Sequence, residues 1–178
     1  MSDMGEHDRL LRRSVSNRVT ADGLVPPGAT VLCLGARSGA EVLAFLDRGC
    51  FAVGIDLNPG AHSSSVLYGD FQKIQWPAAS VDVVFTNSLD HAFDINVVLG
   101  EIIRVLSPSG IVIVEAVRGI AEGHPPGVYE SFYWHTTDDL VSLLTSQGLN
   151  VLKRYPFDEP WNGEHIVLQP MSSTKPPV

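Results

Sequence analysis

Residues 30–56 combine two short apolar runs with a glycine turn and a helical repeat. Residues 31–34 (VLCL) form a continuous apolar run, which is typical of a strand buried on both faces. Gly35 and Gly39 bracket the turn that follows, where a missing β-carbon lets the backbone bend sharply and approach a ligand. Residues 40–47 then repeat apolar side chains at helical spacing, and residues 52–55 form a second apolar run. This order predicts a strand, a tight turn, a helix and a second strand of an α/β sheet.

Asp56 stands at the carboxyl end of the second predicted strand. In an open parallel sheet, ligands bind at the carboxyl ends of the strands, and a carboxylate there can accept hydrogen bonds from a ribose diol. The stretch therefore predicts a cofactor that contains a nucleoside.

The length and charge of the chain narrow its class. We expect a single domain over residues 1–170, with an N-terminal helix, and a disordered tail over residues 171–178. The net charge of −8 argues against broad binding to nucleic acids or anionic membranes, which favour basic surfaces. Four arginines near the N-terminus form either a local basic patch or the solvated face of a helix: Arg9, Arg12, Arg13 and Arg18.

Two cysteines, Cys33 and Cys50, do not make a disulfide framework, and both are expected to be small buried residues. No apolar run approaches the roughly 20 residues of a membrane helix. The N-terminus (MSDMGEHDRLLRR) lacks the apolar centre of a secretion signal. We therefore expect a cytoplasmic protein that does not bind membranes.

The glycine turn distinguishes two cofactor families. The dinucleotide pattern G-x-G-x-x-G would need glycines at positions 35, 37 and 40, where the chain has Gly35, Arg37 and Ala40. An acidic residue followed by G-x-G-x-G aligns instead with Cys33, Gly35, Arg37 and Gly39. The segment resembles the nucleotide loop of the class I S-adenosylmethionine-dependent methyltransferases, with Cys33 for the acid and Arg37 for the central glycine. In that family the acid steadies the loop and helps to hold the methionine end of the cofactor, so the resemblance leaves this task without a residue.

The resemblance implies a set of cofactor contacts. The loop residues Gly35, Ala36, Arg37 and Gly39 would face the cofactor, which the arginine could either obstruct or avoid by pointing outward. Asp56 would bind the ribose, and Leu57 would contact the adenine face.

Gly69-Asp70-Phe71, followed by Trp76-Pro77, resembles the family's adenine-binding turn. There the carboxylate of Asp70 would accept from the exocyclic amine, and Phe71 would pack on the ring. Taken without the resemblance, Asp70 is a turn former.

Residues 80–87 (SVDVVFTN) resemble the family's fourth strand, with Asp82 in a structural role at the strand entrance. The resemblance implies that Asn87, Ser88 and Leu89 meet the amino acid portion of the cofactor through their backbone groups. His91 is a candidate general base, because imidazole can take a proton near neutral pH. Alternatively, it is a helix-capping or surface histidine.

The second half of the chain completes the pattern. Asp94 is a good N-terminal cap for a helix over residues 94–106, which precedes a strand at 111–114. Two further strands are expected at 150–155 and 165–168. The resemblance implies a doubly wound, Rossmann-like α/β sheet of seven strands, six parallel and the last antiparallel.

Residues 129–135 form the densest aromatic patch in the chain. In related methyltransferases this region lines the acceptor pocket, whereas the alternative is a hydrophobic plug over the sheet. Candidate bases near it are Asp90, His91, Glu130 and His135. If the patch is exposed, a protein partner or a second copy in a homodimer would close the pocket.

The resemblance implies methyl transfer from S-adenosylmethionine to an oxygen or nitrogen atom of a small-molecule acceptor, with S-adenosylhomocysteine as product. The alternative, suggested by Cys33 and Arg37, is a catalytically silent module that acts as a binding or regulatory partner. A nicotinamide oxidoreductase would need the missing fingerprint glycines. The six histidines show no metal-ligand spacing, and no N/D-P-P-Y/F motif of nucleic-acid methyltransferases is found.

Overall fold

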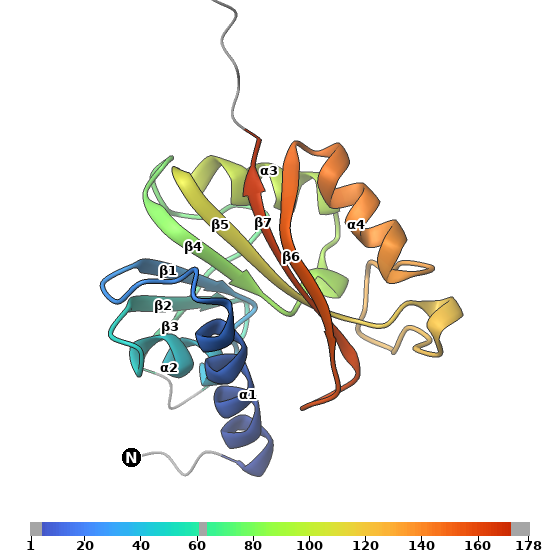
Figure 1. The fold of residues 1–178 in the computed structure, drawn as a ribbon, viewed down its shortest axis with the longest axis horizontal. Helices are drawn as coiled ribbons and strands as arrows, with labels where there is room; N and C mark the ends of the chain where they lie inside the picture. Colours follow the sequence, from blue (N-terminus) through green and yellow to red (C-terminus); the bar gives the residue numbers. More distant parts are fainter. Residues whose placement is uncertain (1–4, 61–63, 172–178) are drawn as a thin grey trace, which may run out of the picture.

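A seven-stranded sheet with helices on both faces is the framework of the computed structural model, which describes residues 5–60 and 64–171 (Figure 1). The strands lie in the order β3-β2-β1-β4-β5-β7-β6. They are β1 (Thr30–Leu34), β2 (Phe51–Asp56), β3 (Val66–Tyr68), β4 (Val81–Thr86), β5 (Leu106–Val117), β6 (Leu149–Phe157) and β7 (Gly163–Pro170). Because β7 is antiparallel to both of its neighbours and all other pairs are parallel, the predicted sheet with one reversed strand is confirmed.

The helices divide between the two faces of this sheet. They are α1 (Glu6–Asp22), α2 (Ala40–Leu46), α3 (Ile95–Val105) and α4 (Thr137–Ser146), with short 3-10 turns η1 (Leu89–His91) and η2 (Ile120–Glu122). α1 and α2 cover one face, and α3 and α4 cover the other (Figure 1). The cap of α3 is the predicted one, since the Asp94 side chain accepts from the backbone N–H groups of Asn96 and Val97.

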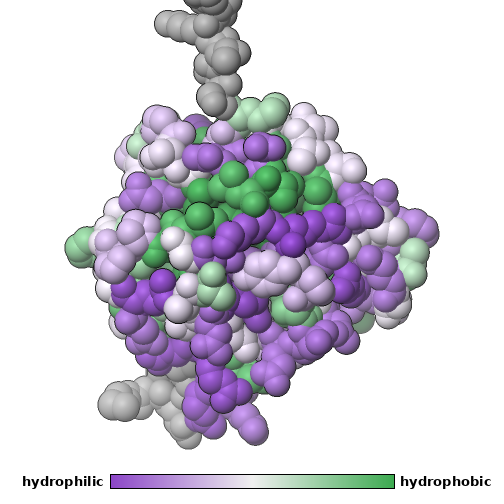
Figure 2. All heavy atoms as spheres, viewed as in Figure 1, coloured by the Kyte–Doolittle hydropathy of each residue, from purple (hydrophilic) through white to green (hydrophobic). Residues whose placement is uncertain are grey.

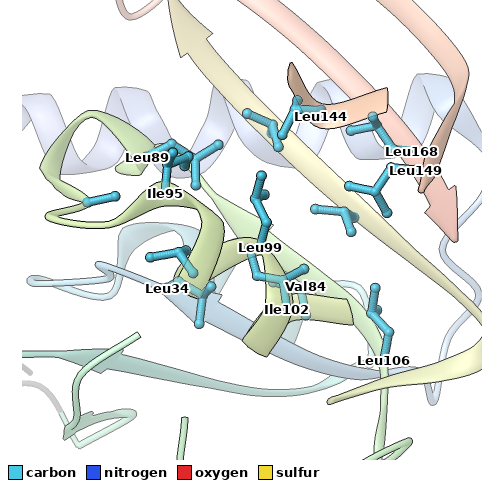
Figure 3. Close-up of a cluster of buried hydrophobic side chains, with 14 of the residues drawn as sticks. Leu34, Val84, Leu89, Ile95, Leu99, Ile102, Leu106, Leu144, Leu149 and Leu168 are labelled. Atoms are coloured by element: carbon cyan, nitrogen blue, oxygen red, sulfur yellow. The ribbon is translucent and has the colours of Figure 1, made fainter. Parts of the chain in front are cut away.

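The layer between α3, α4 and the sheet is apolar. Figure 3 shows Leu99 and Ile102 of α3 beside Leu34 and Val84 of the central strands. Both α3 side chains are fully buried. The contacts in this layer are apolar. They stabilise the sheet and contribute no polar side chain to a binding site.

β5 begins earlier in the chain than the strand predicted at 111–114. The strand begins at Leu106, and its register with β4 shifts between the pairs Val81–Leu106 and Val83–Ile111. The extra residues form a bulge, which Gly110 permits because an added β-carbon would lie 3.0 Å from the Ser107 carbonyl oxygen and 3.1 Å from that of Asp82. Pro108 and Gly110 therefore bend the strand instead of preceding it.

A buried polar network ties α1 to the antiparallel end of the sheet. The Arg18 guanidinium donates to both oxygens of Glu115 on β5, each at 2.7 Å. The His165 ring on β7 lies between two carboxylates, with Nδ1 3.0 Å from Glu115 and Nε2 2.7 Å from Asp22. Tyr155 donates to the other oxygen of Asp22 at 3.1 Å. Arg18 is thus buried and does not lie on a solvated helix face, in contrast to Arg12, whose exposed side chain pairs with Asp47.

Figure 2 shows hydrophobic residues gathered in the upper middle of the view and bordered by hydrophilic ones. A hollow of about 360 Å³ is lined by Leu24, Pro26, Val83 and Ile111. It lies at the amino end of β4, away from the end at which ligands of such sheets bind. No helix in the described part of the chain is both long enough and apolar enough to cross a membrane.

Candidate functional site

The glycine loop between β1 and α2 is built on close backbone contacts. Gly35 has a φ of +69°, and a β-carbon added there would lie 2.6 Å from both Cβ and Oγ of Ser88. The backbone N–H groups of Gly35 and Ala36 both donate to the Ile55 carbonyl, at 2.9 and 3.1 Å. Glycine is therefore required at position 35 for conformation and for space. These contacts hold the loop between the ends of β2 and β4.

Asp56 is fastened to this loop. One carboxylate oxygen accepts from the Arg37 N–H at 3.0 Å and the other from the Asn58 N–H at 2.7 Å. Each oxygen keeps a second lone pair for another donor. The Arg37 carbonyl in turn accepts from the Gly60 N–H at 2.8 Å, so residues 57–60 fold back onto the loop.

Arg37 occupies the central glycine position with a φ of +32°, a region that side-chain-bearing residues rarely adopt. Its side chain is exposed. Among the described residues no ion pair involves its guanidinium. The side chain therefore lies at the rim of the site and does not fill it.

The other predicted adenine contacts surround the loop at different depths. Phe71 is partly buried beside Gly35, whereas the Leu57 side chain is half exposed. Asp70 accepts from the Gln72 N–H at 2.8 Å, which closes an Asx turn. The turn-forming role of Asp70 is thus present in the structure, and one of its oxygens is not used by this bond.

A cleft of about 420 Å³ opens beside the loop. Its lining comes from the loop, from α1 and from the end of β4: His7, Asp8, Leu11, Gly35, Ala36, Arg37, Ser38, Glu41 and Asn87. Ser38 donates to the Asp8 carboxylate at 3.0 Å, so the N-terminal turns of α1 form one wall. α1 therefore covers one side of the cleft.

The cleft lies where the order of the strands reverses. The chain proceeds from β1 outward through β2 and β3, then returns to β4 on the other side of β1. Adjacent strand ends diverge at such a switch point and leave a crevice for a ligand. The volume is within the range of small-molecule and cofactor sites.

Comparisons with known proteins agree with this geometry. Residues 32–114 match the family described as a methyltransferase domain. A malonyl-[acyl-carrier protein] O-methyltransferase from Serratia marcescens is 28% identical over 114 residues, which cover 58% of this chain and 44% of that protein. The chain therefore spans less than half the length of this curated relative. The chain is thus similar to S-adenosylmethionine-dependent methyltransferases, as the resemblance of its glycine loop implies.

Solved structures of the methyltransferase family share the fold across nearly the whole chain. The 1,6-didemethyltoxoflavin-N1-methyltransferase of Burkholderia thailandensis, solved with 1,6-didemethyltoxoflavin and S-adenosylhomocysteine, has a TM-score of 0.73 at 18% identity, covering 92% of this chain and 80% of that one. An Aquifex aeolicus methyltransferase has a TM-score of 0.71 at 17% identity, with 93% of each chain covered. A putative methyltransferase of Haloferax volcanii, in complex with the Trm112 activator, has a TM-score of 0.65 at 21% identity, covering 95% of this chain and 99% of that one.

The region that the methyltransferase resemblance gives to the acceptor is built around η1. The backbone carbonyl of Asp90 accepts from the N–H groups of Ser131 and Phe132, at 2.8 and 2.9 Å. His91 Nδ1 lies 3.1 Å from the Tyr129 carbonyl oxygen. These bonds fasten the aromatic patch to the end of β4.

One part of the aromatic patch is a hydrophobic plug over the sheet, and another part is exposed. Trp134 is buried in the core and donates to the Val117 carbonyl at 3.1 Å, so it plugs the sheet. Tyr129 and Tyr133 are 85% and 58% exposed, so they do not. A small hollow between these parts is lined by Asp90, Glu130, Phe132 and Trp134, among others. Burial raises the pKa of Asp90, and the nearby negative charge of Glu130 adds to this rise.

Of the residues predicted from the sequence, Gly35, Ala36, Arg37 and Asn87 line the cleft directly. Ser88 contacts Gly35, and Asp56 bonds to the loop behind it. The Leu89 side chain is 3% exposed and packs in the core, so only its backbone can face a ligand. His91 and Asp90 lie on η1, which continues from the strand end that supplies Asn87.

The cleft residues that the sequence analysis missed include two acids, Asp8 and Glu41. Asp8 belongs to a helix that the sequence alone does not place over the loop. Glu41 follows the glycine turn and resembles a polar residue on the outer face of an amphipathic helix. Its position directly after Gly39, at the end of the helix that faces the loop, was the only available signal.

Proposed function

We propose that the protein transfers the methyl group of S-adenosylmethionine to an oxygen or nitrogen atom of a small molecule, with S-adenosylhomocysteine as product. The observation that carries this proposal is the position of Asp56, held by two backbone N–H groups beside a cleft at the switch point of the sheet. Such a carboxylate is fixed before any ligand arrives and has lone pairs free for a ribose diol.

The remaining contacts follow from the same frame. Backbone groups of residues 35–39 and 87–89 would meet the amino acid portion of the cofactor. Asp70 has an oxygen free for the adenine amine, while Phe71 and Leu57 would contact the ring. The cofactor supplies an electrophilic sulfonium methyl group, and the protein must hold the acceptor atom in line with the carbon–sulfur bond.

His91 is the base that the geometry favours for an acceptor that must lose a proton. Since the Tyr129 carbonyl can only accept, the ring nitrogen beside it carries the proton, and the neutral ring keeps its lone pair on Nε2. An imidazole in this tautomer can take a proton near neutral pH. His91→Asn should lower kcat by roughly 10²- to 10⁴-fold while leaving the affinity for S-adenosylhomocysteine unchanged.

The exposure of Tyr129 and Tyr133 supports a second copy or another protein as a cover for the acceptor side. Light scattering on the purified chain between low and high micromolar concentration would test this. A strict monomer at all concentrations would exclude the homodimer and leave a different protein as the cover.

Calorimetric titration with S-adenosylhomocysteine tests the proposed function. We expect binding by the wild-type chain and roughly ten- to a hundredfold weaker binding by Asp56→Asn, because a charge-assisted hydrogen bond pair is lost. Asp158→Asn, an exposed acid outside the cleft, is the matched control and should bind as the wild type does. Absence of binding at millimolar ligand would overturn the proposal in favour of a silent module.

A further inference from the structure

Glu41 is a buried carboxylate on the wall of the cleft. It lies on the first turn of α2, is 3% exposed, and lines the same cavity as Gly35, Arg37 and Asn87. Among the described residues, no lysine, arginine or histidine side chain forms an ion pair or hydrogen bond with it. A carboxylate taken out of water without a cation is costly, so such groups either become protonated or receive a positively charged partner.

The surroundings of Glu41 are acidic. Burial raises its pKa to about 8, and the negative charges of Glu115 on β5, Asp8 on α1 and Asp56 on β2 oppose its ionisation further. The basic side chains of the cleft lining are Arg37 and His7, and both are exposed. Among the described residues, no basic side chain of the cleft lining is as buried as Glu41, so a ligand with a positive group would be favoured at that depth.

Cys33 cannot supply the negative charge itself. The thiol lies at the end of β1, is fully buried, and has a raised pKa because of burial and because of the neighbouring charge of Glu41. The thiol is therefore neutral. Because the charge of Glu41 contributes to the raised pKa of the thiol, the two groups are close enough to interact electrostatically. Among the described residues of the cleft lining, the buried carboxylate is that of Glu41, which comes from the helix instead of the strand.

We propose that Glu41 binds the α-ammonium group of the methionine portion of the cofactor, in the role that the residue at position 33 does not fill. This assignment rests on the proposed function. In the empty cleft Glu41 holds a proton. When the ammonium group binds, this proton leaves for the solvent, and the carboxylate and the ammonium group form the ion pair.

Two ligands separate this role from a structural one. S-adenosylhomocysteine carries the amino acid group, whereas 5′-methylthioadenosine has the same nucleoside and sulfur without it. We expect Glu41→Gln to weaken S-adenosylhomocysteine roughly ten- to a hundredfold and to leave 5′-methylthioadenosine within about twofold of the wild type. Asp47→Asn removes one negative charge at the opposite end of the same helix and should change neither affinity.

Proton release gives a readout that does not depend on any variant. Titration of the wild-type chain with S-adenosylhomocysteine at pH 7, in two buffers of different ionisation enthalpy, should show release of close to one proton, since Glu41 starts mostly protonated there. The same titration with 5′-methylthioadenosine, or of Glu41→Gln with either ligand, should show none.

The outcomes are distinguishable. Wild-type binding of both ligands, with no proton release or with equal affinity losses for the two in Glu41→Gln, would overturn the assignment of Glu41 and leave the proposed function intact. No binding of either ligand by the wild-type chain would overturn both.

Discussion

Two glutamates are buried under the same helix, and their surroundings differ in one respect. Glu115 lies beneath the C-terminal half of α1 and is fully buried, but Arg18 and His165 bind its oxygens. Burial alone would raise its pKa, yet these two partners lower the pKa below the usual value. Glu41 lies beneath the N-terminal end of α1. The α1 residues that line the cleft with it include Asp8 and His7 but no arginine, and the pKa of Glu41 is raised. α1 therefore neutralises one carboxylate, whereas the other has no cationic partner among the residues that the structure describes.

The presence or absence of a cationic partner distinguishes a structural role of a buried carboxylate from a binding role. A buried charge with a permanent partner fixes an element in place, and here it fixes α1 on β5 and β7. A buried acid without one is a cost that the fold bears unless a ligand removes it. Sites of perturbed pKa in clefts are frequent places of function for this reason.

Breaking the paired carboxylate should have the largest effect. Glu115→Gln leaves the Arg18 guanidinium buried beside a neutral group, and we expect a loss of roughly 3–5 kcal/mol in the free energy of unfolding. Urea denaturation at pH 7, followed by circular dichroism, measures this. Double replacement by apolar residues, Arg18→Met with Glu115→Leu, should recover most of the loss. A single variant that loses under about 1 kcal/mol would show that the network does not anchor α1.

The unpaired carboxylate should produce the opposite pH dependence. Because the folded-state pKa of Glu41 is raised from 4.5 to about 8, its protonated form favours the folded state below pH 4.5, and this advantage is lost as the pH rises through 8. Glu115 has the reverse sign, since its lowered pKa contributes stability above pH 4.5 that is lost in acid. Relative to Glu41→Gln, the wild-type chain should lose on the order of 3 kcal/mol between pH 5 and pH 8.

Unfolding free energies at pH 5, 6.5 and 8 for both proteins, without ligand, measure this difference. If the unfolding free energies of the two proteins changed equally with pH, Glu41 would be ionised at neutral pH and another group would already balance its charge.

Local patterns sufficed for most of the fold. The runs at 31–34 and 52–55, the Asp94 cap and the glycines at 35 and 39 each act within a few residues, so the sequence shows them directly. The bulge in β5 could not be predicted, because Pro108 and Gly110 favour a turn and only pairing with β4 converts it into a bend within a strand. Asp56 could be predicted from its place at a strand end, but not the backbone bond from Arg37 that fixes it.

Burial of polar residues was beyond local patterns. Arg18 and Glu115 are 97 positions apart, and His165 is another 50 beyond Glu115. In the sequence, Arg18 belongs to a group of four arginines, and a solvated face is the natural interpretation for such a group. Glu41 likewise looks like a surface residue until α1 covers it. Which polar side chains lie inside depends on how distant elements pack.

Substitutions of Arg37 test whether the backbone of the glycine loop, which lies near Glu41, is strained. Arg37→Gly should relieve the left-handed conformation and stabilise the chain by about 1 kcal/mol, less a few tenths for the greater freedom of the unfolded chain. Arg37→Ala removes the same side chain but keeps the β-carbon, so it should not stabilise. Because the guanidinium is exposed at the rim, both variants should bind S-adenosylhomocysteine within about threefold of wild type. A large gain in affinity in both would show that the arginine blocks the cleft.

The smallest effect is expected at an ion pair that is exposed to solvent. Arg12 on α1 donates to both oxygens of Asp47, at 2.7 and 2.5 Å, and both side chains are exposed. A double-mutant cycle with Arg12→Ala and Asp47→Ala should give a coupling below about 1 kcal/mol that shrinks further in 0.5 M salt. The bidentate geometry of this pair resembles that of Arg18 with Glu115, which is buried and has His165 as a further partner. A coupling near 3 kcal/mol at the exposed pair would mean that bidentate geometry, and not exclusion from water, holds α1 on the molecule.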